Sequence, residues 1–171
     1  MANRYYLKNS QFSKTDNCVF ISHQQKDKEA ARDIANYINK SGVDIYFDEY
    51  DNSIDRNNPQ SVVNAIKTGV RRSTYMLCVL SNNALKSHWM PWEIGYGYDL
   101  LMVYGITIKE LSKAVLPEFL QVVPVLRGTK SLNTFIASIL GKKEESLIYE
   151  QKIYSASYMN HPLDKVLDWQ M

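Results

Sequence analysis

Short apolar runs alternate with stretches of helical periodicity along most of this sequence, and this alternation limits the folds open to it. Residues 18–21 and 75–80 are continuous apolar runs, which is typical of strands buried on both faces of a sheet. Val43, Ile45 and Phe47 occupy every second position, which predicts another strand. Three strands separated by helical segments indicate a layered α/β domain.

Helical segments are predicted between and after these strands. Gly42 is placed to end the first helix, and Asn58 followed by Pro59 predicts the N-cap and first residue of the second. The predicted helices cover residues 26–41, 59–70, 88–100 and 132–140, and a short helix is predicted within 106–118. A further strand is predicted at 121–126, where Pro124 indicates an edge strand or a bulge. We therefore expect a central parallel sheet with helices on both faces.

Length and composition exclude several other classes. With 171 residues, the chain is long enough for one domain with a short appendage. A net charge of +2 is too small for a dedicated nucleic-acid or membrane binder, and no apolar run reaches the ~18 residues of a membrane span. Residues 1–6 lack the apolar core of a secretory signal, and two cysteines cannot form a disulfide framework or a zinc cluster. We expect a small, soluble, cytoplasmic protein.

The polar residues that follow the predicted strands are the first candidates for a site, because ligands of such sheets bind beyond the carboxyl ends of the strands. They are Ser22, His23, Gln24 and Gln25; Asp48, Glu49 and Asp51; Ser81, Asn82 and Asn83; and Arg127. Neither a P-loop nor a G-x-G-x-x-G motif follows a predicted strand, so we expect no bound nucleotide cofactor. The three histidines lack the spacing of metal ligands, and no metal site is predicted.

Residues 87–98 concentrate aromatic side chains around a single carboxylate. Trp89 and Glu93 are four residues apart and share one helix face, which Tyr96 extends. One interpretation makes the tryptophans core anchors and Glu93 a surface residue near a helix N-terminus. The other makes the segment a site, because Gly95 and Gly97 inside a helix each cost roughly 1 kcal/mol and indicate close approach of a backbone or ligand.

Several stretches resemble the boxes of Toll/interleukin-1 receptor (TIR) domains in their bacterial form. Residues 20–29 (Phe-Ile-Ser-His through Asp-Lys-Glu) resemble the first box, and residues 45–49 resemble the strand that leads into the BB loop. Residues 80–89 are similar to the third strand and the following helix entry, Trp89 and Glu93 fit the W-x-x-x-E spacing, and residues 123–125 match the next strand. The likeness covers about residues 17–141, in the family's order.

This resemblance implies a flavodoxin-like domain that cleaves NAD⁺ at the nicotinamide–ribose bond, as substrate rather than cofactor. Glu93 is then the catalytic carboxylate, and the substrate-binding candidates are Ser22, His23, Gln24, Tyr46, Asp48, Ser87, Trp89 and Trp92. The product is ADP-ribose or a cyclised or conjugated ADP-ribose signal, read by a downstream effector in Thoeris-type antiphage defence. The resemblance also implies homo-oligomers formed through TIR–TIR contacts, although residues 51–59 lack the Pro-Gly pair common in the BB loop.

The expected organisation is an N-terminal extension (1–16), the TIR domain (17–141) and a C-terminal appendage (142–171) that is either an assembly element or a packed tail. Two further functions remain open: a non-catalytic TIR interaction module, and an enzyme like the nucleoside deoxyribosyltransferases, with a glutamate nucleophile. A receiver domain that is phosphorylated on Asp48 is disfavoured, because Ser22 and His23 stand where such domains need an acidic pair.

Overall fold

The protein is described by a computed structural model, which covers residues 17–48 and 54–169. In this part of the chain five parallel strands form one sheet in the order β2-β1-β3-β4-β5. The strands are β1 (Cys18–Ser22), β2 (Asp44–Tyr46), β3 (Tyr75–Leu80), β4 (Met102–Thr107) and β5 (Val125–Leu126). Val19 pairs with Ile45 on one side and with Tyr75 on the other, so β1 lies between β2 and β3.

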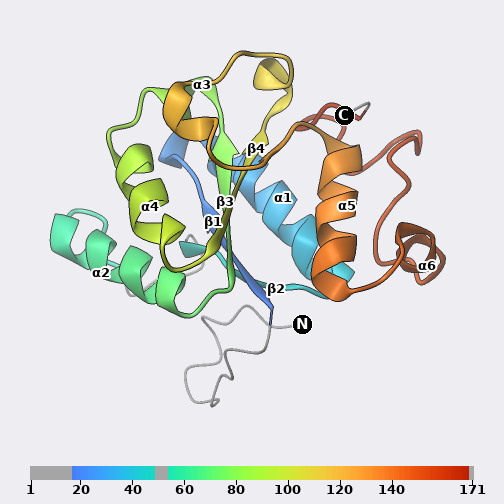
Figure 1. The fold of residues 1–171 in the computed structure, drawn as a ribbon, viewed down its shortest axis with the longest axis horizontal. Helices are drawn as coiled ribbons and strands as arrows, with labels where there is room; N and C mark the ends of the chain where they lie inside the picture. Colours follow the sequence, from blue (N-terminus) through green and yellow to red (C-terminus); the bar gives the residue numbers. More distant parts are fainter. Residues whose placement is uncertain (1–16, 49–53, 170–171) are drawn as a thin grey trace.

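Helices cover both faces of the sheet, as expected. They are α1 (Lys28–Ser41), α2 (Pro59–Arg71), α3 (Asn82–Leu85), α4 (Trp89–Tyr98), α5 (Thr129–Leu140) and α6 (Glu144–Tyr149), with 3₁₀ turns η2 (Gln25–Asp27), η4 (Lys109–Leu111) and η5 (Glu118–Leu120). Figure 1 shows α1 and α5 on one face and α2 and α4 on the other. None of the helices in the described ranges is long and apolar enough to cross a membrane.

The helix ends follow the sequence signals. Gly42 and Gly141 end α1 and α5 in the left-handed conformation, with φ of 108° and 61°, where a side chain would be strained. The Asn58 side chain caps α2 by accepting hydrogen bonds from the backbone N–H groups of Gln60 and Ser61. These predicted boundaries are confirmed.

Two apolar clusters fill the space between the sheet and its helices. One lies under α1 and α5 and includes Val19, Ile21, Ile45, Phe47 and Phe135, and the other lies under α2 and α4 and includes Phe20, Tyr46, Met76, Met90 and Ile94. Alternate residues of β1 therefore enter opposite clusters, as the pleat requires. This two-sided burial explains why β1 and β3 are continuous apolar runs.

Two predicted elements differ from the structure, one in type and one in length. The sequence predicted a short helix within residues 106–118, but β4 extends to Thr107 and only a 3₁₀ turn follows it. The strand predicted at 121–126 is present as β5 and lies at the edge of the sheet, as Pro124 indicated. It is shorter than predicted and contains only Val125 and Leu126, because Pro124 has no N–H to donate to the ladder.

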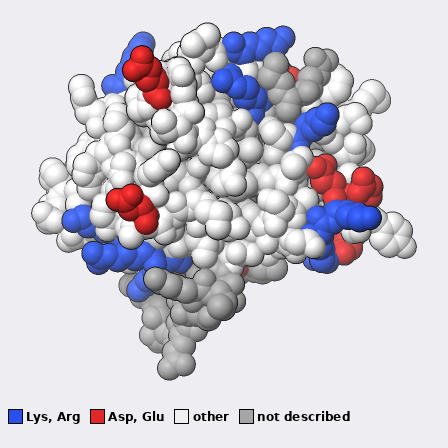
Figure 2. Space-filling model, in the orientation of Figure 1, with Lys and Arg blue, Asp and Glu red and all other residues white. Residues whose placement is uncertain are grey.

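The segment after α5 packs against the domain. Leu147, Ile153, Leu163, Val166 and Leu167 are buried and belong to the same apolar cluster as α1 and α5. In Figure 1 this segment, from orange to red, runs beside α5. The predicted extension at 1–16 lies outside the described residues. On the face in Figure 2, Lys and Arg lie in small groups near the margins, interspersed with Asp and Glu, around a wide uncharged area.

Candidate functional site

The sheet has a topological switch point between β1 and β3. From β1 the chain passes outward to β2 through α1, whereas from β3 it continues in the opposite direction to β4 and β5. Connections on either side of such a point diverge, and this leaves a crevice beyond the carboxyl ends of the two strands. Ser22 ends β1 at this place, and Ser81 directly follows β3.

Glu93 lies over this crevice from α4. Its side chain is buried, with only 8% of the residue exposed, and the Ser22 hydroxyl donates a hydrogen bond to its Oε2. The contact joins residues 71 positions apart in the sequence. Glu93 is therefore not the surface residue of the first interpretation; it is a buried carboxylate held at the end of β1.

The surroundings of Glu93 raise its pKa to about 7. Burial is the largest cause, because it removes water from the charged form. The hydrogen bond from Ser22 opposes this shift, and the negative charge of Asp48 adds to it. At neutral pH the neutral and ionised forms of the Glu93 carboxyl are thus both populated, a property that structural carboxylates rarely need.

Asp48 and His23 form a second polar group at the same end of the sheet. His23 Nδ1 lies 3.7 Å from Asp48 Oδ1, and the imidazole packs on the Phe47 ring with the centroids 4.8 Å apart. Arg56 contacts the same carboxylate, with Nη1 3.5 Å from Asp48 Oδ2, and its Nη2 donates to the Asp48 main-chain oxygen at 3.0 Å. The predicted candidates Glu49 and Asp51 lie outside the described residues.

Side-chain hydrogen bonds tie the loop after β1 to the segment that leads into α4. Gln24 Nε2 donates to Ser87 Oγ at 2.8 Å, and the same Oγ accepts the N–H of Trp89 at 3.1 Å. Ser87 therefore contacts both Gln24 and the backbone at the start of α4, and it is not among the residues that line the pocket.

A buried carboxylate anchors the far end of that loop. Asp27 accepts hydrogen bonds from the Ser81 hydroxyl and, at 2.8 Å, from the Asn83 amide. Together with the Ser22 and Gln24 contacts, this fixes the loop at three points along its length. A fixed loop keeps the residues near Glu93 in one arrangement without ligand.

The aromatic candidates have different positions. Trp89 is 43% exposed and lies at the pocket, whereas Trp92 stacks on Tyr96 with centroids 5.6 Å apart and meets the edge of Trp89 at 5.8 Å. Tyr46 does not fit its predicted substrate-binding role, because it is only 2% exposed and packs against Phe20 in the core. The sheet is buried on both faces, so alternate residues of β2 do not reach solvent.

A pocket of about 150 Å³ lies beside Glu93 at the switch point. Of the predicted site residues, it brings together seven: Ser22, His23, Gln24, Gln25, Asp48, Trp89 and Glu93. Arg56 also lines this pocket, and sequence reasoning missed it because it lies in an aperiodic loop. The two glycines of α4 differ in the space around them. A Cβ on Gly97 would lie 2.6 Å from Met76 Sδ, whereas a Cβ on Gly95 would have none of the described atoms within 4 Å.

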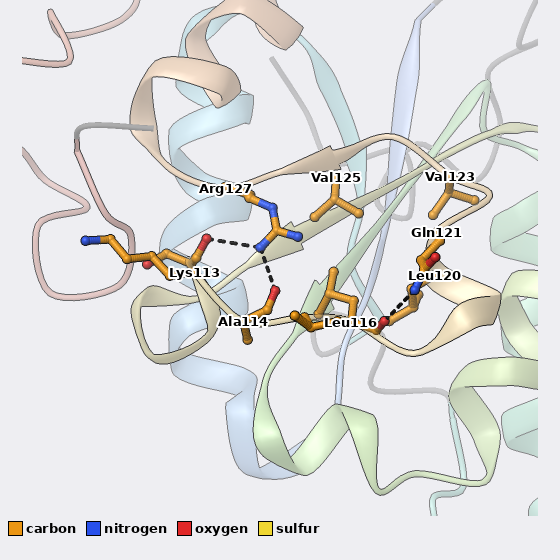
Figure 3. A pocket seen from close by; sticks show the side chains of 10 residues that line it. Lys113, Ala114, Leu116, Leu120, Gln121, Val123, Val125 and Arg127 are labelled. Atoms are coloured by element: carbon orange, nitrogen blue, oxygen red, sulfur yellow. Dashed lines mark hydrogen bonds between the residues drawn. The ribbon is translucent and has the colours of Figure 1, made fainter.

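A larger pocket, of about 570 Å³, is formed by residues 112–127 (Figure 3). Its walls are mainly apolar and include no carboxylate, and the Arg127 guanidinium donates to the main-chain oxygens of Ser112 and Ala114 at 3.1 and 3.0 Å. Arg127, a candidate by its position after a strand, thus ties down the loop that precedes it. Within the described ranges no group of His, Cys, Asp and Glu is suited to hold a metal ion.

The strand order and the buried glutamate define the class: a flavodoxin-like α/β domain with a carboxylate site at its switch point. The chain belongs to the TIR-domain family, whose model matches residues 19–134.

Among curated relatives, the chain is 29% identical to 2′ cyclic ADP-D-ribose synthase AbTIR of Acinetobacter baumannii (strain 1295743) over 132 residues, which are 71% of this chain and 44% of that protein. It is 33% identical over 84 residues to the probable 3′ cyclic ADP-D-ribose synthase ThsB′ of Bacillus cereus (strain MSX-D12), covering 46% of this chain and 42% of the relative.

The NAD(+) hydrolase TcpC of Escherichia coli O6:H1 (strain CFT073) is 32% identical over 76 residues, which are 44% of this chain and 24% of that protein. The chain therefore spans less than half the length of each of these three relatives.

Proposed function

We propose that this chain cleaves NAD⁺ at the bond between nicotinamide and ribose, with Glu93 as the catalytic carboxylate. The observation that carries the proposal is the burial of Glu93 in the switch-point pocket, with its Oε2 bonded to Ser22. The names of the relatives, which are cyclic ADP-ribose synthases and an NAD⁺ hydrolase, support NAD⁺ as the substrate.

The chemistry suits a single carboxylate. When the glycosidic bond breaks, its electron pair moves to the nicotinamide nitrogen, so the base leaves neutral and no strong general acid is required. Positive charge then develops on the ribosyl C1′, and an ionised Glu93, itself buried, stabilises that charge. A water or a ribose hydroxyl adds to C1′, and the proton it loses goes to the carboxylate or to solvent.

The neighbouring residues bind the substrate in this proposal. The exposed Trp89 ring stacks on the planar nicotinamide, and His23 and Gln24 supply hydrogen bonds at the end of β1. The cationic nicotinamide ring favours the ionised form of Glu93 once it is bound. We place the product, linear or cyclic ADP-ribose, in antiviral signalling through a separate effector, as the TIR resemblance implies.

The test is to incubate the purified protein with NAD⁺ and, separately, with a deoxynucleoside plus a free base, and to identify the products by mass spectrometry. We expect nicotinamide together with linear or cyclic ADP-ribose from NAD⁺, and no base exchange. Base exchange without NAD⁺ cleavage would support a deoxyribosyltransferase instead. An absence of turnover on both substrates, at concentrations where the protein self-associates, would support an interaction module.

A further inference from the structure

Arg56 is the one lysine or arginine among the described residues that line the pocket beside Glu93. It lies at the rim, with 40% of its side chain exposed, whereas Glu93 is buried within the pocket. We propose that Arg56 binds the diphosphate of the substrate and so holds the half of the dinucleotide that does not react. This inference rests on the proposed function, because it takes NAD⁺ as the ligand.

The order of groups in the pocket matches the order of groups in NAD⁺. The diphosphate is attached to the 5′ carbon of the nicotinamide ribose, so it lies beyond the ribose when C1′ faces Glu93. When the nicotinamide and its ribose occupy the pocket, the diphosphate therefore lies at the open rim of the pocket, where the Arg56 guanidinium lies. The pocket, at about 150 Å³, is too small to enclose a whole dinucleotide, which also places the diphosphate outside.

The charges of the pocket favour such a cation. Glu93 and Asp48 both line it, and two carboxylates repel an anionic group. A guanidinium offers a planar fork of N–H donors that matches phosphate oxygens, and it keeps its charge at any pH that the protein tolerates. Arg56 is thus the described pocket residue whose chemistry suits a diphosphate.

The present contacts of Arg56 with Asp48 allow this exchange. Its Nη2 donates a hydrogen bond to the Asp48 main-chain oxygen at 3.0 Å, but its Nη1 is 3.5 Å from Asp48 Oδ2, which is long for a charged hydrogen bond, and both side chains are partly exposed to solvent. Exposed pairs of this kind contribute little to stability. A dianionic diphosphate therefore competes well for the guanidinium, and His23 remains beside Asp48, with Nδ1 3.7 Å from Oδ1.

The first experiment measures binding without turnover. Calorimetric titration with ADP compares the wild type with Arg56→Gln, Arg56→Lys and Arg71→Gln; Arg71, in the last turn of α2, provides an exposed control with the same change in charge. We expect Arg56→Gln to weaken ADP binding about tenfold or more, Arg56→Lys to weaken it less, and Arg71→Gln to leave it within about twofold. No ADP binding by the wild type, or equal binding by Arg56→Gln, would overturn the inference.

The second experiment compares two substrates with the same scissile bond. Nicotinamide riboside has the same scissile bond but lacks phosphate. Arg56→Gln should therefore lower kcat/KM for NAD⁺ about tenfold, whereas kcat/KM for the riboside should change less than about twofold. If the riboside is not cleaved, its inhibition constant against NAD⁺ is compared instead. Equal losses on both would mean that Arg56 acts through Asp48 and not on phosphate. If the wild type binds ADP through Arg56 but releases no nicotinamide, the proposed function fails and the anion site stands.

Discussion

Glu93 combines burial with a hydrogen bond that favours its charged form, and this balance sets when the site is active. The pKa of the carboxyl is raised to about 7. Only the ionised carboxylate stabilises a developing positive charge, so the pKa of this one residue determines the fraction of competent protein below neutral pH.

The rise of kcat/KM with pH, the ascending limb of the pH profile, tests this balance. Two neighbours of Glu93, Ser22 and Asp48, should shift this limb in opposite directions. Ser22→Ala removes the hydrogen bond that lowers the Glu93 pKa, so the limb of kcat/KM should move to higher pH. Asp48→Asn removes a charge that raises the pKa, so the limb should move to lower pH. The limb is read from kcat/KM for NAD⁺ across pH 5 to 9. Shifts in the same direction, or no shift, would contradict the assignment of Glu93 as the titrating group.

The raised pKa also makes Glu93 a cost to stability at neutral pH. Below pH 4.5 the Glu93 carboxyl is neutral in both the folded and the unfolded chain. Between pH 4.5 and about 7 it is ionised in the unfolded chain but still largely neutral in the folded protein, so the free energy of unfolding of the wild type falls as pH rises. Glu93→Gln lacks this loss and should gain relative to the wild type over that range, by up to about 3 kcal/mol. Denaturant unfolding at pH 4 and pH 8 measures the difference. A gap that does not widen with pH would show that the carboxyl is not buried as described.

At the scale of elements, much of the fold follows from sequence pattern. The strands β1 and β3 are continuous apolar runs, and the ends of α1, α2 and α5 carry Gly and Asn-Pro signals. The strand β4 escaped prediction because no turn signal separates it from α4 and because Gly105, which lets Leu80 pack close to the backbone, interrupts its apolar run.

The same contrast holds for the candidate site. Ser22, Gln24 and Glu93 could be predicted because strand ends and helix spacing place them by periodicity. The burial of Tyr46 could not, because the alternation along β2 does not show that a helix covers its second face. Arg56 could not either, since its place at the pocket depends on the path of an irregular loop.

The packing of α2 on the sheet gives a prediction at this scale. A Cβ on Gly69 would lie 2.6 Å from both Phe20 Cε2 and Tyr46 Cε1, two buried rings with no room to move. Gly69→Ala should therefore destabilise the protein by about 1–2 kcal/mol, since overpacking outweighs the gain in helix propensity. Gly95→Ala, on the open side of α4, should be neutral or stabilise by up to about 1 kcal/mol. Equal effects in chemical denaturation would contradict this packing.

For the whole molecule, the small pocket implies that one copy does not enclose the substrate. Sites for ligands of this size measure roughly 300–1,000 Å³, compared with about 150 Å³ here. We therefore expect a second copy to complete the site, in line with the TIR–TIR contacts that the resemblance implies. NAD⁺ turnover per molecule should rise with protein concentration as oligomers form, followed by light scattering in parallel. Full turnover by a dilute sample shown to be monomeric would contradict this expectation.

The segment after α5 also belongs to this scale. Leu147, Leu163 and Leu167 complete the cluster under α1 and α5, on the opposite face of the sheet from α4. The end of the segment also reaches the carboxyl edge of the sheet, where the N–H groups of Lys109 and Thr129, just after β4 and β5, donate to the main-chain oxygens of Val166 and Asp168. None of its described residues lines the switch-point pocket.

The most direct test of the central claim is nicotinamide release from NAD⁺ by the wild type and by Glu93→Gln, measured by chromatography at pH 8 and at a protein concentration that permits self-association. At this pH the Glu93 carboxyl is mostly ionised. The wild type should release nicotinamide, and Glu93→Gln, with an unchanged circular dichroism spectrum, should release it at least about a hundredfold more slowly. Nicotinamide release at the wild-type rate by folded Glu93→Gln would contradict the account.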